Sequence, residues 1–222
     1  MEELIQIEKE AQENSKIAKH EKEVAQKLKE NATVEIKKSK ARESLMKIEY
    51  KLADIKTDLA KKRKDLAEEK TEIKKNNILD FSDEELKIEN EYAIYNAKIA
   101  KVQKEIAEIN KKIAGAEKEI AEQKLDVAKE KLDVAKAREN LGKKQQIYLK
   151  VARSQSSEEK ILKAKNNLEK QKKQLIKQKK DVLEAENDVK KKENKLADLK
   201  KDQSLKLAER EKIRHPGVVL AS

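Results

Sequence analysis

The chain has 222 residues and a net charge of +11; 45% of its residues are charged and only 2% are aromatic. Gly occupies three positions, Pro one and Cys none, which excludes β-rich folds, disulfides and thiolate metal sites. An apolar content of 36% is too low for a thick globular core but suits helices that bury two or three positions in every seven.

The first expected element is a helix over residues 2–76. Apolar residues recur in it at intervals of seven, which is typical of a coiled coil: Ile17, Val24, Leu45, Leu52, Leu59, Leu66 and Ile73. Asn31 and Lys38 interrupt this series and are expected to fix register or mark local fraying, with a binding role as the alternative. An alanine follows most members: Ala18, Ala25, Ala32, Ala53, Ala60 and Ala67. We expect the aliphatic series to form the buried seam.

A short connection is expected before the second helix. Asn76 and Asn77 suit a helix C-terminus, and Ser82 followed by Glu85 has the spacing of a capping box. Apolar residues between them are expected to cover the end of the bundle: Ile78, Leu79 and Phe81.

The second helix is expected over residues 83–153 and carries the longest heptad series in the chain. Its nine members are Tyr92, Ile99, Ile106, Ile113, Ile120, Val127, Val134, Leu141 and Tyr148. The next position is alanine from Ala93 to Ala135 and then becomes Gly142 and Leu149. Small residues there allow a second helix to approach closely. So long a series also argues against disorder, which high charge alone would suggest.

A third helix is expected over residues 157–213, with Ser156 and Glu159 forming a second capping box. Its heptad series is Ile161, Leu168, Leu175, Val182, Val189 and Leu196. Residues 214–222 are expected to form a non-helical tail, because Pro216 and Gly217 break helices and Val218 to Leu220 favour an extended backbone.

These elements predict an all-α fold: an elongated antiparallel coiled coil of three long helices, arranged as a rod-like bundle or an extended hairpin. At about 1.5 Å per residue the helices would measure about 110, 105 and 80 Å. The short connections make successive helices antiparallel, and residues 1–213 would form a single domain. Self-association or another protein partner would help to stabilise so thin a core.

The sequence offers little material for catalysis. His20 and His215 stand at opposite ends, and there is no Gly-rich phosphate loop, HExxH or GxSxG motif. We therefore expect a non-enzymatic protein with no cofactor, metal or small-molecule substrate.

The excess positive charge gathers on the third helix, where 18 Lys and Arg face 12 Asp and Glu between Glu158 and Lys212. Candidate anion-binding residues are Lys172, Lys173, Lys179 and Lys180. A basic rod of three antiparallel helices resembles BAR domains, which implies binding to anionic membranes; an ordinary solvated face is the alternative. Specific nucleic-acid binding is disfavoured, because arginine and aromatic residues are scarce.

Two segments support a different resemblance. The tail reads IRHPGVV, and residues 148–171 read YLKVARSQSSEEKILKAKNNLEKQ, with an S-x-x-E helix start after a short turn. This arrangement resembles the α-helical hairpin of periplasmic adaptor (membrane-fusion, HlyD-like) proteins, which ends in I-R-A-P-x-D-G-V-V. The resemblance implies that Arg153, Ser154 and Ser156 lie at a hairpin tip that meets an outer-membrane channel.

Three functions stay open from the sequence: a structural spacer, scaffold or tether that contacts other proteins through its helices, an adaptor hairpin in export, and a basic rod that binds a membrane or polyanion. The chain shows no signal peptide or transmembrane segment, so both cytoplasm and periplasm remain open.

Overall fold

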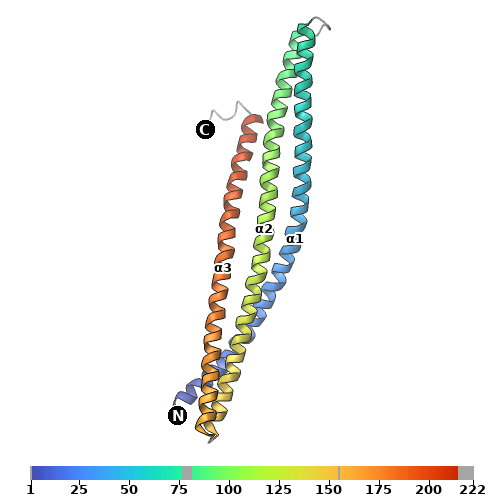
Figure 1. Cartoon of the computed structure of the whole chain (residues 1–222). Helices are drawn as coiled ribbons and strands as arrows, with labels where there is room; N and C mark the ends of the chain where they lie inside the picture. Colours follow the sequence, from blue (N-terminus) through green and yellow to red (C-terminus); the bar gives the residue numbers. More distant parts are fainter. Residues whose placement is uncertain (1, 77–81, 155, 215–222) are drawn as a thin grey trace. The chain divides into compact units, whose positions relative to one another are not determined.

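The computed structural model describes residues 2–76, 82–154 and 156–214. Within these ranges the fold is all-α, as predicted, and consists of three helices and no strand. They are α1 (Glu2–Lys75), α2 (Asp83–Arg153) and α3 (Glu158–Arg214), shown in Figure 1. The expected helix boundaries differ from the observed ones by a single residue at most.

Backbone hydrogen bonds mark the ends of the helices. The Asn76 amide donates to the Glu72 carbonyl at 3.0 Å, and the Leu86 amide donates to the Ser82 carbonyl at 3.1 Å. Ser82 is therefore the residue that precedes α2, as the sequence indicated.

At the start of α3 the predicted capping residue is wrong. The amide of Ile161 donates to the carbonyl of Ser157 at 3.2 Å, which makes Ser157 and not Ser156 the residue before the helix. The hydroxyl of Ser156 lies 2.9 Å from that of Ser154 instead. Arg214, the first residue of the predicted tail, is still helical. The predictions for Asn77, Ile78, Leu79, Phe81 and residues 215–222 lie outside the described residues.

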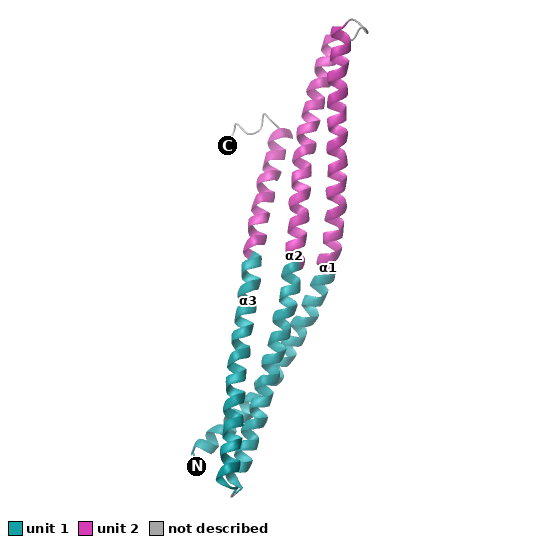
Figure 2. Cartoon of the chain, in the orientation of Figure 1, with its two compact units in different colours: residues 1–37, 119–193 teal, residues 38–118, 194–222 magenta. Residues whose placement is uncertain are grey.

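The chain divides into two compact units, coloured in Figure 2, where the sequence suggested one domain over residues 1–213. Unit 1 contains residues 1–37 and 119–193, and unit 2 contains residues 38–118 and 194–222. Each unit holds one segment of each helix.

In both units α2 pairs with α1 and with α3, and ion pairs between distant residues show that neighbouring helices are antiparallel. In unit 1 the pairs are Glu21 with Arg138, Glu8 with Arg153, Lys131 with Glu186 and Lys124 with Glu193. In unit 2 they are Arg42 with Glu117, Lys70 with Glu89, Lys74 with Asp83 and Lys206 with Glu105.

The α2 aliphatic series is buried over most of its length. Its buried members are Ile106, Ile113, Ile120, Val127, Val134 and Leu141. In unit 1 the series forms a hydrophobic cluster with Leu168, Leu175 and Val182 of α3, and Tyr148 packs against it. Tyr92 does not follow the prediction and is 64% exposed. In unit 2, α3 reaches Glu105 through Lys206 and ends eight residues later, which is too short to cover Tyr92.

The expected seam of α1 is also wrong, because its aliphatic series is largely exposed, although Val24 in unit 1 lines a groove beside α2. Leu45, Leu52, Leu59 and Leu66 are 49–53% exposed, and Ile17 and Val24 are 41–42% exposed. The alanines beside them are buried instead: Ala18, Ala25, Ala32, Ala53, Ala60 and Ala67. The alanines of α2 are buried as well, from Ala93 to Ala135. Two rows of methyl groups therefore form the α1–α2 interface, and their small size permits a close approach of the two backbones.

Candidate functional site

Arg153, Ser154 and Ser156 lie together at the turn between α2 and α3, in unit 1. The Arg153 guanidinium donates to Glu8 Oε2 on α1 at 2.6 Å, and this hydrogen bond holds the pKa of Glu8 below its ordinary 4.5. Ser154 donates to the Val151 carbonyl at 3.2 Å, while its hydroxyl and that of Ser156 are 2.9 Å apart. The three predicted residues are brought together, but their polar atoms already have partners within the chain.

The four candidate lysines of α3 do not converge on one point. Lys172 and Lys180 form ion pairs within their own helix, with Glu169 at 3.1 Å and Glu184 at 3.5 Å. Lys173 and Lys179 are exposed. Because neighbouring carboxylates offset two of the four charges, this face provides a diffuse positive potential and not a built anion site.

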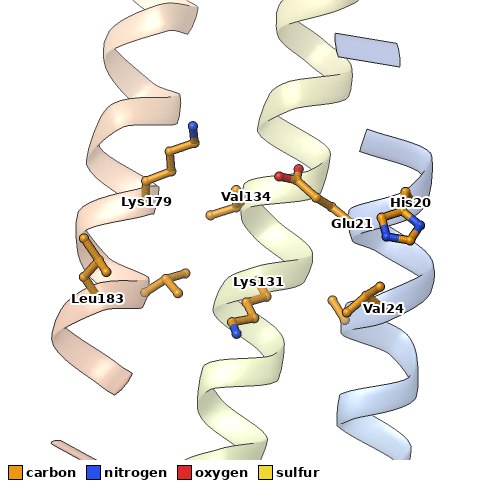
Figure 3. Close-up of a pocket in the computed structure, with 9 residues that line it drawn as sticks. His20, Glu21, Val24, Lys131, Val134, Lys179 and Leu183 are labelled. Atoms are coloured by element: carbon orange, nitrogen blue, oxygen red, sulfur yellow. The ribbon is translucent and has the colours of Figure 1, made fainter. Parts of the chain in front are cut away.

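Lys179 also lines an open groove of about 450 Å³ in unit 1. Figure 3 shows its walls: His20 and Val24 from α1, Val134 from α2, and Leu183 with Lys179 from α3. Its lining is mostly aliphatic, and two of its three charged side chains are bound to partners within the chain, whereas Lys179 is exposed. Glu21 pairs with Arg138, and Lys131 pairs with Glu186 at 2.7 Å.

A polar network that the sequence analysis missed joins α1 to α2 near this groove. Gln145 is 1% exposed; it accepts a hydrogen bond from Asn14 Nδ2 at 2.9 Å and donates one to Glu10 Oε2 at 3.1 Å. Arg138 donates to both carboxylate oxygens of Glu21, at 2.8 and 2.9 Å, and its Nη1 is 3.4 Å from Asn14 Oδ1. A buried network of this kind fixes the register of two helices, because any slip would leave its groups unpaired.

The sequence did carry a signal for this network. Asn14 and Glu21 are seven residues apart on α1, and Arg138 and Gln145 are seven apart on α2. Polar residues with heptad spacing on two antiparallel helices occupy facing positions, just as apolar ones do.

Gly142 lies between these polar residues, at a point where the backbone of α1 comes close to α2. A Cβ built on Gly142 would be 3.3 Å from the Ala11 carbonyl oxygen and 3.7 Å from Asn14 Cβ. The same construction at Gly115 of α2 meets no atom within 4 Å. Gly142 therefore occupies the next position in the alanine series of α2, seven residues after Ala135, and is smaller still.

In unit 2, Thr57 is the buried polar residue at the α1–α2 interface. Its hydroxyl lies 2.8 Å from the Ala53 carbonyl oxygen and 3.2 Å from that of Ala100 on α2. Both of its hydrogen-bond acceptors are therefore backbone carbonyl groups. This contact places the Ala53, Thr57 and Ala60 side of α1 against α2.

The described residues contain no group of three or more His, Cys, Asp or Glu side chains arranged to hold a metal ion. None of the described helix segments is long and apolar enough to cross a membrane.

Searches of protein-family models, of curated proteins and of solved structures found no match to this chain.

Proposed function

We propose that the chain is a non-enzymatic coiled-coil spacer, scaffold or tether, which holds other proteins at a set separation. One observation carries this proposal: in both units α2 buries residues at heptad spacing against its neighbours, an aliphatic series and an alanine series side by side. Because the helix packing repeats every seven residues, a coiled coil can be extended by adding heptads that make the same contacts. Each added heptad lengthens the helices by about 10 Å.

The polar residues support the same proposal. The network of Gln145 and Arg138 and the ion pairs between helices fix which heptad of α1 faces which heptad of α2. A protein whose role is to set a distance needs such register control, since a slip of one heptad would change its reach by about 10 Å.

A matched deletion tests the spacer function. The pairs Lys70–Glu89 and Lys74–Asp83 show that residues 68–74 of α1 and 85–91 of α2 lie at the same level of unit 2. Removing both segments shortens the α1–α2 hairpin by one heptad while keeping all other pairs in register. The expected result in a cell that depends on the protein is loss of function with helicity intact by circular dichroism.

A charge-swap variant is the control for this deletion. Exchanging Lys173 with Glu169 and Lys180 with Glu184 changes neither the length of any helix nor the net charge of the chain. A spacer tolerates this exchange. Normal function after the heptad deletion, or loss of function after the exchange alone, would contradict the spacer proposal and favour a charged binding surface.

The second candidate is the adaptor hairpin, and the position of Arg153 and Ser154 at the α2–α3 turn favours it. If this turn docks on a channel, Arg153→Ala together with Ser154→Ala should abolish function with unchanged helicity. Glu8→Gln, which removes the intramolecular partner of Arg153, should then preserve docking. Full activity of the double variant would eliminate the adaptor hypothesis.

A further inference from the structure

One face of α1 in unit 2 carries aliphatic side chains that the described part of the chain does not cover. Their exposed fractions are 49–64%: Leu45, Ile48, Leu52, Ile55, Leu59 and Leu66. We call this set the Leu45–Leu66 face. From Leu45 to Leu59 its spacing alternates between three and four residues, which is the pattern of the a and d positions of a heptad.

The same helix segment buries a different face. Ala53 and Ala60 take the b positions of this heptad and Thr57 takes an f position, and Thr57 contacts the Ala100 carbonyl of α2. On a helical wheel the b and f positions lie almost opposite the a and d positions. The Leu45–Leu66 face therefore points away from α2, and its a/d pattern is suited to packing against another helix.

We propose that the Leu45–Leu66 face binds the same face of a second copy of this chain, with the two α1 helices antiparallel. In the register that places Leu52 opposite Ile55 of the second copy, Ile48 lies opposite Leu59. Leu45 then lies opposite Lys62, whose aliphatic stem can cover it while the ammonium group stays in water.

Charge complementarity selects this partner and this register. Antiparallel helices bring e positions beside e positions and g positions beside g positions. Glu49 of one copy then lies beside Lys56 of the other, and Lys51 lies beside Asp58. Symmetry repeats both contacts, so four opposite-charge pairs flank the centre of the dimer. All four side chains are exposed, and none forms an ion pair within the described residues.

Other arrangements of the same two faces bring like charges together. A parallel, in-register dimer places Lys62 opposite Lys62 in the seam and Lys51 beside Lys56. An antiparallel register shifted by one heptad pairs either Lys51 with Lys51 and Glu49 with Glu49, or Asp58 with Asp58 and Lys56 with Lys56. Of these arrangements, the register centred between Ala53 and Asp54 alone avoids repulsion at the four central e and g positions. Farther from the centre it places Arg42 beside Arg63 of the other copy, and Arg42 also pairs with Glu117 of its own chain at 2.7 Å.

Sedimentation equilibrium of the full chain tests the proposal. The expected result is a reversible dimer with twice the 25.6 kDa mass of the chain. Leu52→Lys with Ile55→Lys should weaken the dimer by about 100-fold or more, because two ammonium groups enter the apolar seam from each copy. Both side chains are at least half exposed, so the variant should keep its helicity.

The matched control carries the same substitutions on α3. Ile176→Lys with Leu183→Lys replaces two aliphatic residues that are 68% and 59% exposed, and it should leave the dimer unchanged. A wild-type chain that stays monomeric at about 100 μM, or a control variant that dissociates as readily as the α1 variant, would overturn the proposal.

A charge variant tests the orientation. Lys56→Glu should weaken an antiparallel dimer by about 10-fold, because a carboxylate then faces Glu49, and adding Glu49→Lys should restore affinity. In a parallel dimer Lys56→Glu would face Lys51 and strengthen binding instead. These measurements use the isolated chain, so their failure leaves the proposed spacer function untouched.

A spin label gives an independent distance. The chain has no native cysteine, and Ser44 is exposed at the edge of the face. Labels on Ser44→Cys should be about 30 Å apart in the antiparallel register, from 19 residues of rise, and about 10 Å apart in a parallel dimer. The shorter distance would rule out the antiparallel arrangement.

Discussion

Replacing Gln145 by alanine should destabilise unit 1 more than any other single glutamine substitution in α2. The side chain is 1% exposed and makes two hydrogen bonds to α1, with Asn14 at 2.9 Å and with Glu10 at 3.1 Å. The neutral bond contributes about 1 kcal/mol and the bond to the carboxylate about 2 kcal/mol. Water can partly replace them, because Glu10 and Asn14 are half-buried, and alanine regains a few tenths of a kcal/mol in helix propensity. The expected loss is about 2 kcal/mol.

The assay is urea unfolding followed by far-ultraviolet circular dichroism. Hydrogen exchange of the α2 peptides in unit 1 adds a readout local to the compact unit that contains Gln145. Gln146→Ala is the matched control, because this neighbouring side chain is exposed and should change stability by less than about 0.5 kcal/mol. Gln145→Leu keeps most of the volume, so any loss that remains reports the hydrogen bonds. Equal stabilities of Gln145→Ala and Gln146→Ala would refute the network's role in joining α1 to α2.

Two further predictions concern a pair of glycines and acid stability. Gly115→Ala should stabilise the chain by up to about 1 kcal/mol, because helix propensity improves and the new methyl group meets nothing. Gly142→Ala should gain less or lose stability, since its methyl group lies 3.3 Å from the Ala11 carbonyl; identical melting shifts for both variants would contradict the close approach. Hydrogen bonds from Lys47 and Lys118 lower the pKa of Glu43 from 4.5 in the folded chain. The ionised carboxylate therefore stabilises the folded state fully above pH 4.5, and this stabilisation is lost as pH falls through the lower, folded-state pKa. Thermal melts between pH 7 and 3 should show a smaller acid-induced decrease for Glu43→Gln than for the wild type; an unchanged decrease would argue against this linkage.

Heptad spacing and turn residues were enough to predict the three helices and their boundaries. They were not enough to predict which side of α1 faces α2, since its leucines and its alanines have the same period. Hydrophobicity alone favours burying Leu52 over Ala53, and the structure does the reverse. The difference arises from α2: its own alanines and Gly142 allow a close approach that leucine side chains would prevent. Which side of α1 faces α2 therefore depends on the side chains of both helices and cannot be predicted from the sequence of either helix alone.

The candidate site shows the same limit. Arg153 and Ser154 were correctly placed at a turn, because the S-x-x-E spacing that follows them is typical of a helix start. Their partners could not be predicted: Glu8 is 145 residues away from Arg153. The network of Asn14 and Gln145 could have been predicted, because its polar residues are spaced by seven on each helix. Polar residues at heptad positions are, however, easily interpreted as solvent-exposed.

The alanine interface also bears on how the chain assembles. Burying an alanine methyl group yields about 0.8 kcal/mol, whereas fully burying a leucine side chain yields about 1.5–3 kcal/mol. In unit 2, α1 therefore makes its contact with α2 through its less hydrophobic side, and register is held by Thr57 and by ion pairs such as Arg42 with Glu117. Among the described residues, the larger aliphatic area, from Leu45 to Leu66, remains exposed. If Leu52 and Ile55 packed on α2 instead, the exposed alanine side could not supply a comparable driving force. The proposed antiparallel dimer thus follows from the same packing choice that brings α1 and α2 close together.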